Sequence, residues 1–477
     1  MQLQVDGSVL RDEAGRQRVL HGISLVAKGA TPGQGSDEEY RRSFYGTWTA
    51  SDITDLAARG FTLVRLGVIW AAVEPEPGRY DETYLDHLAD QLDLLHGAGI
   101  AVLLDAHQDL YSQCFGDGAP PWATLTDQPF TATDLWSDAY LTEPAVHQAL
   151  DAFWANTPGP GGLGLQDSFA AMWARVATRL GGHPAVIGFD LLNEPAPGSP
   201  AGPIFEAVLG AFAHATGQDV QQVAADFADP EAKLAQLGRL EDETVHRQVG
   251  DAVAGLVQTF ETEQVAPLMA RVTSAVRSTG NDKLIAREHS YFANLGIPSG
   301  QPPLADPAWV YSPHGYDLTV DTPAIALSSN TRAGTIFARH RQTQQRLGVP
   351  VIAGEWGAFG QATGISDHAQ FLMDTFDAYG WSWTYWCWEE GFAGTEAAQV
   401  LTRPRPLAFA GDGATWVVRG SHLRAAWQGR SGTAPSVFFL PAGAGVVRRD
   451  GQVVAAEQDG PWLQVPAGDG AYTLEVE

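Results

Sequence analysis

The stretch that decides the fold is "VIGFDLLNEPAPG", residues 186–198. Its first seven residues have the nearly continuous hydrophobicity of a parallel strand that is covered on both faces. The strand ends directly in Asn193 and Glu194, and Pro195 stops it. A core strand that delivers an amide and a carboxylate at its tip indicates a functional site at the carboxyl edge of a parallel sheet.

Seven other segments share this pattern of an apolar run that ends in polar residues. Helix-like segments separate most of them; "YLDHLADQLDLLHGAG" (84–99) has apolar residues at spacings of three and four. Eight buried strands that alternate with helices predict a (β/α)8 TIM barrel, in which all strand tips lie at one face. The expected strands are 18–26, 61–70, 100–109, 186–195, 283–290, 309–317, 350–357 and 382–390.

The pattern changes after about residue 400. Short alternating segments divided by Gly, Asp and Pro then predict a small β-sandwich. We therefore expect two domains, a barrel over 1–400 and a sandwich over 401–477. Two connections, after the third and fourth strands, are longer than usual and should overhang the catalytic face. The second, from 196 to about 250, should be largely helical.

Composition excludes several classes of function. The net charge of -27 on 477 residues argues against binding to nucleic acid or to an anionic membrane surface. The sequence contains no run of about 18 apolar residues, so we expect no membrane span, and it shows no signal peptide. Cys114 and Cys387 form no disulfide framework and lack zinc-site spacing; one bridge and two free thiols are both compatible with them. Fifteen tryptophans suit a surface that stacks on sugars.

Two strand tips carry carboxylates that should face each other across the barrel mouth. They are Glu194 and Glu355, the latter in "GEWG" (354–357). One carboxyl group that protonates the leaving oxygen and another that attacks the sugar are the requirements of glycoside hydrolysis. A single glutamate at a strand end is more often solvated or ion-paired, but companions at the other tips favour catalysis. These are Arg65, His107, Asp109, Asn193, His314, Tyr316 and Trp386.

Two other classes of function fit less well. A metal-dependent barrel hydrolase would need His-x-His on its first strand, whereas "HGIS" (21–24) offers only His21, so we expect no metal and no cofactor. A sugar-binding barrel without catalytic activity would need neither Glu194 nor Glu355.

Several motifs together resemble a known family. "LLNEP" (191–195), "HGY" (314–316), "GEWG" and "YW" (385–386) resemble glycoside hydrolase family 5, a retaining family with a (β/α)8 barrel. More narrowly, the chain is similar to the endoglycoceramidases over essentially its whole length, through "LVAKG" (25–29), "AHQDLYS" (106–112) and "GDGAPPWA" (116–123). The resemblance implies cleavage of the β-glycosidic bond between the oligosaccharide and the ceramide of glycosphingolipids. The alternative is a β-glucan-cleaving, cellulase-like member of the same family.

The resemblance also implies a role for each site residue. Glu194 resembles the acid/base and Glu355 the nucleophile, so their pKa values should be pushed apart, with Glu355 charged and Glu194 protonated. Glu288 should be a hydrogen-bond partner of the site rather than a third carboxylate in the cleft. The resemblance further implies that Asn193 binds the sugar 2-hydroxyl and that Arg65, His314 and Tyr316 contact the nucleophile. Lys28, His107 and Asp109 should bind the sugar next to ceramide, and Trp386 should stack against that sugar.

A ceramide leaving group would need an apolar groove. "CFGDGAPPWATL" (114–125) and the helical "GPIFEAVLGAFAHA" (202–215) are candidates, although the apolar stripe of the second is more typical of a helix that faces the core. From the resemblance we also expect a secreted monomer that contacts lipid or detergent micelles transiently, without stable membrane insertion.

Overall fold

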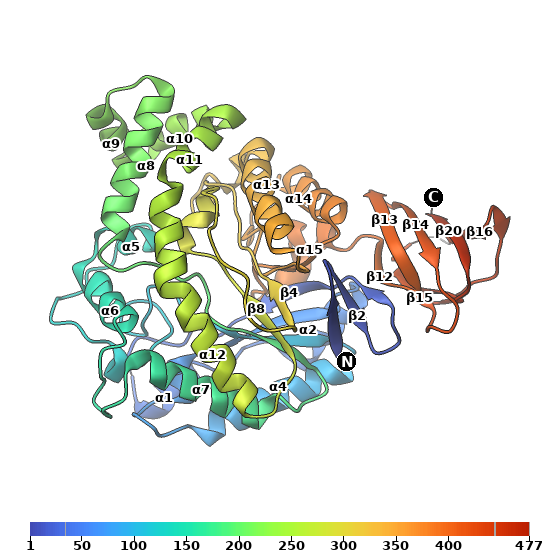
Figure 1. Cartoon of the computed structure of the whole chain (residues 1–477), viewed down its shortest axis with the longest axis horizontal. Helices are drawn as coiled ribbons and strands as arrows, with labels where there is room; N and C mark the ends of the chain where they lie inside the picture. Colours follow the sequence, from blue (N-terminus) through green and yellow to red (C-terminus); the bar gives the residue numbers. More distant parts are fainter. Residues whose placement is uncertain (34, 443–444, 477) are drawn as a thin grey trace.

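The computed structural model describes residues 1–33, 35–442 and 445–476. In these residues eight parallel strands form one sheet in the order β10-β11-β4-β5-β6-β7-β8-β9 (Figure 1). Isolated bridges from Tyr311 to Val351 and from His314 to Glu355 connect its two edge strands, so the sheet curls into a barrel. The predicted TIM barrel is confirmed. Its strands are β4 (His21–Leu25), β5 (Leu63–Val68), β6 (Ala101–Ala106), β7 (Val186–Asp190), β8 (Leu284–Arg287), β9 (Trp309–Tyr311), β10 (Ile352–Ala353) and β11 (Ser382–Tyr385).

Helices surround this barrel and bury their apolar faces against it. One of them, α4 (Glu82–Gly97), buries Leu85, Leu88, Leu92 and Leu95 at spacings of three and four, as an amphipathic helix requires. The surrounding helices are α1 (Asp37–Arg42), α2 (Ala50–Ala58), α3 (Trp70–Val73), α4 (Glu82–Gly97), α7 (Leu165–Leu180), α12 (Ala266–Ser278), α13 (Asn330–Leu347), α14 (Ser366–Tyr379) and α15 (Glu396–Leu401).

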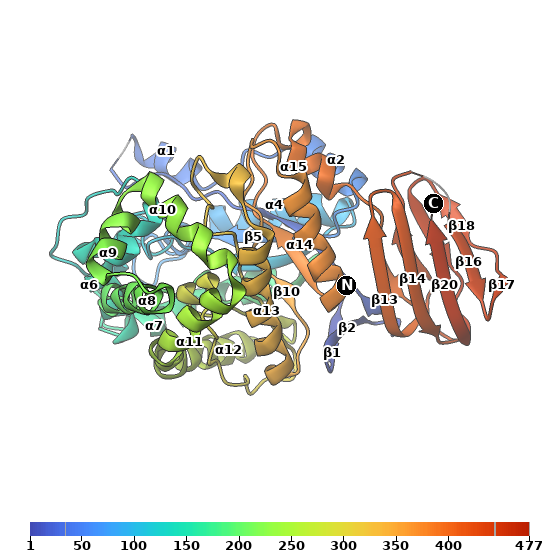
Figure 2. The same cartoon turned by 90° about the horizontal axis from the view of Figure 1, so that it is seen from above.

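Both long connections fold over the carboxyl end of the barrel. The first contains α5 (Ala139–Thr142) and α6 (Pro144–Trp154). The second is helical, as expected, and rises above the barrel in Figure 1, while Figure 2 shows the same helices from above. It consists of α8 (Ala201–Thr216), α9 (Val220–Ala228), α10 (Pro230–Leu237) and α11 (Glu243–Phe260), and a π-helical turn (Glu261–Val265) joins α11 to α12.

The C-terminal region is a β-sandwich, also as predicted. One sheet has the order β13-β14-β20-β16-β17, and the other has the order β1-β2-β3-β12-β15-β19-β18. Aromatic side chains, including Phe409, Trp416 and Trp427, fill the space between them. The strands are β1 (Leu3–Asp6), β2 (Val9–Asp12), β3 (Gln17–Arg18), β12 (Arg405–Phe409), β13 (Gly411–Arg419), β14 (His422–Gly429), β15 (Ser436–Phe439), β16 (Gly445–Arg449), β17 (Gln452–Val453), β18 (Glu457–Asp459), β19 (Trp462–Val465) and β20 (Gly470–Val476).

The first three strands were not predicted. Ala408 of β12 pairs with Arg18 of β3, so the start of the chain extends a sheet that is otherwise built after residue 401. The division of the chain at residue 400 stays a prediction. Among the described residues, no helix has the length and apolarity needed to cross a bilayer. Cys114 and Cys387 are both free thiols.

The sandwich packs closely against the barrel at Gly60. This glycine ends the turn after α2 with a φ of 81°, and a Cβ placed on it would lie 2.6 Å from the Phe439 ring of β15. Arg405 lies in the same junction, 5.6 Å from the Phe61 and Phe439 ring centroids and 5.8 Å from that of Trp383. The junction is therefore a packed interface rather than a linker.

Substitution of Gly60 by Ala should destabilise the protein through this interface. A left-handed conformation costs a residue with a Cβ about 1–2 kcal/mol, and the overlap with Phe439 should add about 1–3 kcal/mol. Gly99 is the matched control, because it has a φ of 75° in the turn after α4 and no atom within 4 Å of its Cβ position. Urea unfolding should show a larger loss for Gly60→Ala than for Gly99→Ala. Equal losses would contradict the packed interface.

Candidate active site

The carboxyl ends of the barrel strands open into a cavity of about 1690 Å³, counted with the open solvent at its mouth. Seven of the ten predicted site residues line it, and the other three, Arg65, Asn193 and His314, are buried next to them. The structure thus brings together all ten residues, which the sequence distributes over 359 positions from the first to the last. The seven that line the cavity are Lys28, His107, Asp109, Glu194, Tyr316, Glu355 and Trp386.

Arg65 of β5 is the centre of the site and is fully buried. Its guanidinium donates hydrogen bonds to five acceptors that come from four other strands or strand tips. Four of the acceptors are carboxylates, which together raise the pKa of Arg65 well above its usual value against the opposing effect of burial. The acceptors are Glu355 Oε1 (2.6 Å), Asp105 Oδ1 (2.8 Å), Asn193 Oδ1 (2.8 Å), Asp190 Oδ2 (2.9 Å) and Glu288 Oε1 (2.9 Å).

Glu355 is held from both of its oxygens. Arg65 binds Oε1, and the Tyr316 hydroxyl donates to Oε2 at 2.6 Å. The Nδ1 of His314 lies 3.5 Å from the same Oε2. These are the three neighbours that the resemblance implied for the nucleophile.

Glu194 lies just after β7 in a strained backbone conformation, with a φ of 43°. Its backbone N–H donates to Glu288 Oε2 at 2.7 Å, and the amide of Gln108 donates to the Asn193 carbonyl at 2.7 Å. A non-glycine residue adopts such a φ only where its surroundings impose it, which is common at active sites. Glu288 is thus a hydrogen-bond partner of the site, as expected.

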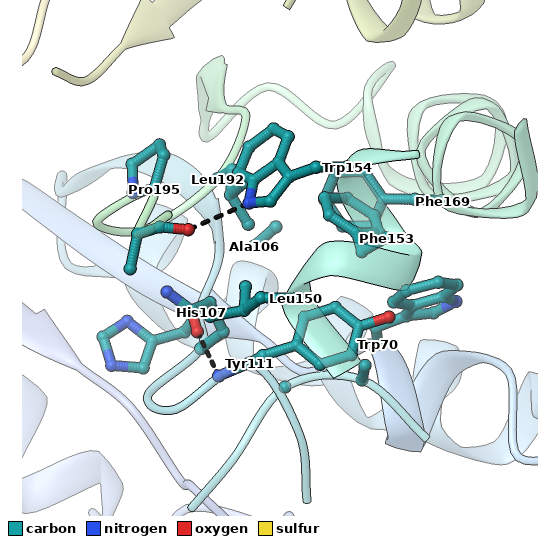
Figure 3. A pocket seen from close by; sticks show the side chains of 14 residues that line it. Trp70, Ala106, His107, Tyr111, Leu150, Phe153, Trp154, Phe169, Leu192 and Pro195 are labelled. Atoms are coloured by element: carbon teal, nitrogen blue, oxygen red, sulfur yellow. Dashed lines mark hydrogen bonds between the residues drawn. The ribbon is translucent and has the colours of Figure 1, made fainter. Parts of the chain in front are cut away.

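Aromatic side chains pack against the segment that carries Asn193 and Glu194 at the end of β7. Figure 3 shows a small apolar pocket at the end of β7, where the Trp154 indole donates to the Ala196 carbonyl at 2.9 Å. On the facing side, the Tyr111 backbone N–H donates to Gln108 Oε1 at 2.6 Å. Gln108 therefore connects the packed pocket to the peptide of Asn193 and Glu194. Sequence reasoning missed Gln108, although it stands between two predicted residues in "AHQD".

The spacing of the two carboxylates discriminates between the two glycosidase mechanisms. An oxygen of Glu194, an oxygen of Glu355 and a nitrogen of His314 all lie within 4.8 Å of one another. Retaining enzymes have their carboxyl groups about 5–5.5 Å apart, whereas inverting enzymes need roughly 6.5–9.5 Å to admit a water molecule. The geometry is that of a retaining pair.

The predicted order of the two pKa values is wrong for this structure. Burial raises the pKa of Glu355 to about 7, against the opposing charges of His314 and Arg65. Burial also acts to raise the pKa of Glu194, but hydrogen bonds from His314 and Asn294 lower it below its usual value. The physical reason is that burial outweighs the favourable charges at Glu355, whereas Glu194 accepts hydrogen bonds from both His314 and Asn294.

A second cluster of polar side chains lines the cavity around Trp386. Lys28 forms an ion pair with Asp109, lies 3.7 Å from Asp117, and places Nζ 5.1 Å from the Trp386 ring centroid. His107 stacks on Trp386 with ring centroids 4.9 Å apart and planes 10° apart. Flat rings beside charged donors and acceptors suit a pyranose, which has apolar faces and a polar rim. Asp117 of the "GDGAP" loop was missed, although that loop was singled out.

The apolar end of the cavity lies under the second long connection. Phe205, Val208, Leu209 and Phe212 of α8 line it, and Leu209 and Phe212 are also part of the core between α8 and α11. The helix thus packs into a core and lines the cavity at the same time. None of residues 114–125 lines this cavity, so that part of the expectation for the groove is wrong; their loop folds back through a bridge from Asp109 to Asp117. Leu135 and Trp136 occupy the wall instead.

Three clusters of histidine and carboxylate groups have donor atoms within 4.8 Å, close enough for a metal ion. In each cluster a protein cation already bonds to a carboxylate. Lys28 does so beside His107, Asp109 and Asp117, and Arg65 does so in the two clusters around His314. The donors of these clusters are engaged in ion pairs within the protein.

The comparisons with known proteins agree with this geometry. Residues 33–391 match the family described as cellulase (glycosyl hydrolase family 5). The chain belongs to glycosyl hydrolase family 5. It is 27% identical to endoglycoceramidase I of Rhodococcus hoagii (strain 103S) over 500 residues, which cover 99% of this chain and 88% of that protein.

Solved structures of endo-glycoceramidase II from Rhodococcus sp. are also similar to it. One of them superposes with a TM-score of 0.74 and 26% identity over 99% of both chains. A second, described as a lactosyl-enzyme intermediate, has the same TM-score and identity over 98% of this chain and 99% of that one. A covalent sugar-enzyme species is what the spacing of a retaining pair permits.

Replacement of Tyr316 by Phe should move the basic limb of activity to higher pH. The hydroxyl donates to Glu355 and lowers its pKa, so its loss should raise that pKa. Activity requires the pair to hold one proton, and Glu355 has the higher pKa of the two, so its pKa governs the loss of that proton. We expect a shift of about one pH unit in the basic limb of kcat/KM. Tyr291→Phe is the control, because Tyr291 lines the cavity without a hydrogen bond to Glu355; an unmoved limb in Tyr316→Phe would contradict the assignment.

Proposed function

We propose that this protein is a retaining, endo-acting glycoside hydrolase that cleaves the β-glycosidic bond between the oligosaccharide and the ceramide of glycosphingolipids. One observation carries the proposal: a single cavity contains both the carboxylate pair and an extensive apolar lining, which we call the apolar channel. A soluble β-glucan has sugars on both sides of the cleaved bond and would need polar groups for both. Apolar side chains from α8, α9, α10 and α11 line this cavity instead.

The apolar end fits the two hydrocarbon chains of a ceramide. Its lining comes from the helices above the barrel, from residues 135–141 and from the segments after β8 and β9, and we assign it to the leaving-group side of Glu194. Burial of hydrocarbon in such a channel contributes about 25 cal/mol for each Å² removed from water. The apolar residues of the wall are Leu135, Trp136, Leu141, Phe205, Val208, Leu209, Phe212, Phe227, Leu237, Leu240, Val249, Phe292, Leu295, Ile297, Leu318 and Val320.

The chemistry would proceed in two displacements. Glu355 attacks the anomeric carbon while Glu194 gives its proton to the ceramide oxygen, so a sugar-enzyme ester forms as the glycosidic bond breaks. Glu194, now a carboxylate, takes a proton from water as the water oxygen bonds to the anomeric carbon, and the ester bond to Glu355 breaks, so the sugar leaves with its anomeric configuration retained. Asn193 keeps one amide hydrogen for the sugar 2-hydroxyl, because its other polar contacts go to Arg65 and Gln108.

The proposal extends to the sugar subsite and to the setting of the enzyme. Lys28, His107 and Asp109 would bind the sugar next to ceramide, with Trp386 as its floor. No cofactor takes part in these steps. The family resemblance supports a secreted monomer that meets its substrate in lipid or detergent aggregates.

Purified protein should release intact glycan and free ceramide from detergent-dispersed glycosphingolipids. Glucosylceramide- and galactosylceramide-linked lipids would be offered in parallel, with products identified by mass spectrometry. Glu355→Gln should reduce the rate by at least about 10⁴-fold, because the covalent route is lost. Glu389→Gln is the matched control, since Glu389 follows the eighth strand but is exposed. Cleavage of a soluble β-glucan without release of ceramide from either lipid would contradict the proposal.

A charge in the apolar channel should weaken binding of the lipid alone. Val208→Asp would place a carboxylate among hydrocarbon-binding residues. We expect KM for the glycolipid to rise about tenfold or more, while kcat/KM for a small aryl glycoside changes less than about twofold. His214→Asp, on the exposed face of the same helix, should change neither. Equal effects of Val208→Asp on both substrates would mean that the channel does not bind the leaving group.

A further inference from the structure

Glu194 has a neighbour that neither the sequence motifs nor the mechanism above uses. The side-chain amide of Asn294 donates a hydrogen bond to Glu194 Oε1 at 2.6 Å. His314 Nδ1 donates to the same oxygen at 3.1 Å. In the described residues no protein group donates to Oε2, so the two oxygens of this carboxylate have different surroundings.

Asn294 stands on a segment that the structure holds from several sides. This segment, residues 290–300, follows β8 and includes the short helix η5 (Tyr291–Leu295). Tyr291 N–H donates to the Pro195 carbonyl at 2.9 Å, so the segment is bonded to the residue after Glu194. Its other contacts are His246 to the Leu295 carbonyl (2.9 Å), Gln258 to the Pro298 carbonyl (3.1 Å) and Arg346 to the Ser299 carbonyl (3.0 Å).

A buried carboxylate provides the strongest of these anchors. Glu261 begins the π-helical turn between α11 and α12 and is fully buried. Its oxygens accept from Ser290 N–H and from the Ser299 hydroxyl, both at 2.9 Å, and from Gly300 N–H at 2.5 Å. It therefore fixes both ends of the segment that presents Asn294. π-helical turns inside α-helices are frequent at functional sites.

The chemistry of a carboxylic acid explains why two donors on one oxygen matter. A protonated carboxyl group has one oxygen that carries the proton and one that accepts hydrogen bonds. With two N–H donors on Oε1, the proton of Glu194 must reside on Oε2. A hydrogen bond from an amide also stabilises the charged form, and it contributes to the lowered pKa of Glu194.

The oxygen of the Asn294 amide indicates that this residue does more than fill space in the core. Its Oδ1 is buried and has no hydrogen-bond partner among the described residues. An unpaired buried acceptor destabilises a fold, and an apolar side chain would avoid that cost. The same segment lines the apolar end of the cavity through Phe292, Leu295 and Ile297, so it touches both the proton donor and the leaving-group channel.

We propose that Asn294 is a positioning residue for Glu194, which confines the catalytic proton to Oε2 and aims it at the oxygen of the leaving group. The inference deepens the proposed function, on which it rests for the identity of that leaving group. It requires only that Glu194 act as the acid. Asn294 should therefore matter for leaving groups that need a proton and not for those that leave without one.

The test compares two β-glycosides of one disaccharide, one with an alkyl and one with a dinitrophenyl leaving group. For Asn294→Ala we expect kcat/KM on the alkyl glycoside to fall about ten- to a hundredfold, and on the dinitrophenyl glycoside less than about threefold. Loss of the amide donor raises the pKa of Glu194, which is the lower of the two pKa values in the pair. The acidic limb of kcat/KM should therefore move to higher pH.

Two further variants make the result specific. Asn294→Asp preserves the shape but replaces the donor by a carboxylate, so it should shift the acidic limb further in the same direction. Asn281→Ala removes an amide from the turn before β8, at the opposite end of that strand from the site, and it should leave both the limb and the ratio of the two substrates unchanged. Equal losses on both leaving groups with an unmoved acidic limb would overturn the proposal.

The ceramide-linked glycoside is measured alongside. If the wild-type protein cleaves both disaccharide glycosides but releases no ceramide, the proposed function fails and the test of Asn294 still stands. If ceramide is released and Asn294→Ala affects both leaving groups equally, the positioning role fails alone.

Discussion

The guanidinium of Arg65 is the interaction on which the site depends. It lies where the barrel strands converge and bonds to the tips of β6, β7 and β8 and to Glu355 beyond β10. A charge buried this deeply would cost several kcal/mol if it were unpaired, and so would each carboxylate around it. The planar fork of arginine satisfies several acceptors at fixed angles, which the point charge of a lysine cannot do. The nucleophile is thus positioned by the same contact that makes its burial tolerable.

This arrangement also determines where protons reside. Burial raises the pKa of Asp105 to about 6 and that of Glu288 well above its usual range, despite the Arg65 charge. Burial alone would lower the pKa of His314, but Glu288, Glu355 and Glu194 raise it well above normal. The Glu194–Glu355 pair is therefore part of a larger coupled cluster, and its activity should follow the population in which the pair holds one proton. Proton transfer within the site can occur over short distances because His314 lies between both carboxylates.

Much of this site could be predicted because barrel topology brings all strand tips to one face. Once the apolar run before Asn193 was interpreted as a buried strand, the residues at the other tips became neighbours without any knowledge of distances. The order of the pKa values could not be predicted in this way. It depends on how burial and the contacts with His314, Arg65 and Asn294 act on each carboxylate, which no sequence pattern encodes. Asn294 and Gln108 were missed because amides outside a motif have no periodic signal.

In the fold, too, local patterns could be predicted from the sequence and long-range contacts could not. Long helices and buried strands are local patterns, whereas the pairing of β3 with β12 joins residues almost 400 positions apart and has only a short polar signature. The connection after β7 was expected to be helical, but its contribution to the cavity depends on which side of α8 faces inward. That side is set by packing against α11, a tertiary contact.

The most direct test of the account is to identify the residue that becomes covalently bonded to the sugar. A glycosyl fluoride with fluorine in place of the 2-hydroxyl would react with the enzyme, and the protein would then be digested and its peptides weighed. We expect one added glycosyl residue on the peptide that carries Glu355, with none in Glu355→Gln. An adduct on Glu194 or Glu288, or no adduct while turnover continues, would contradict the assignment of Glu355 as the nucleophile that Arg65 holds in place.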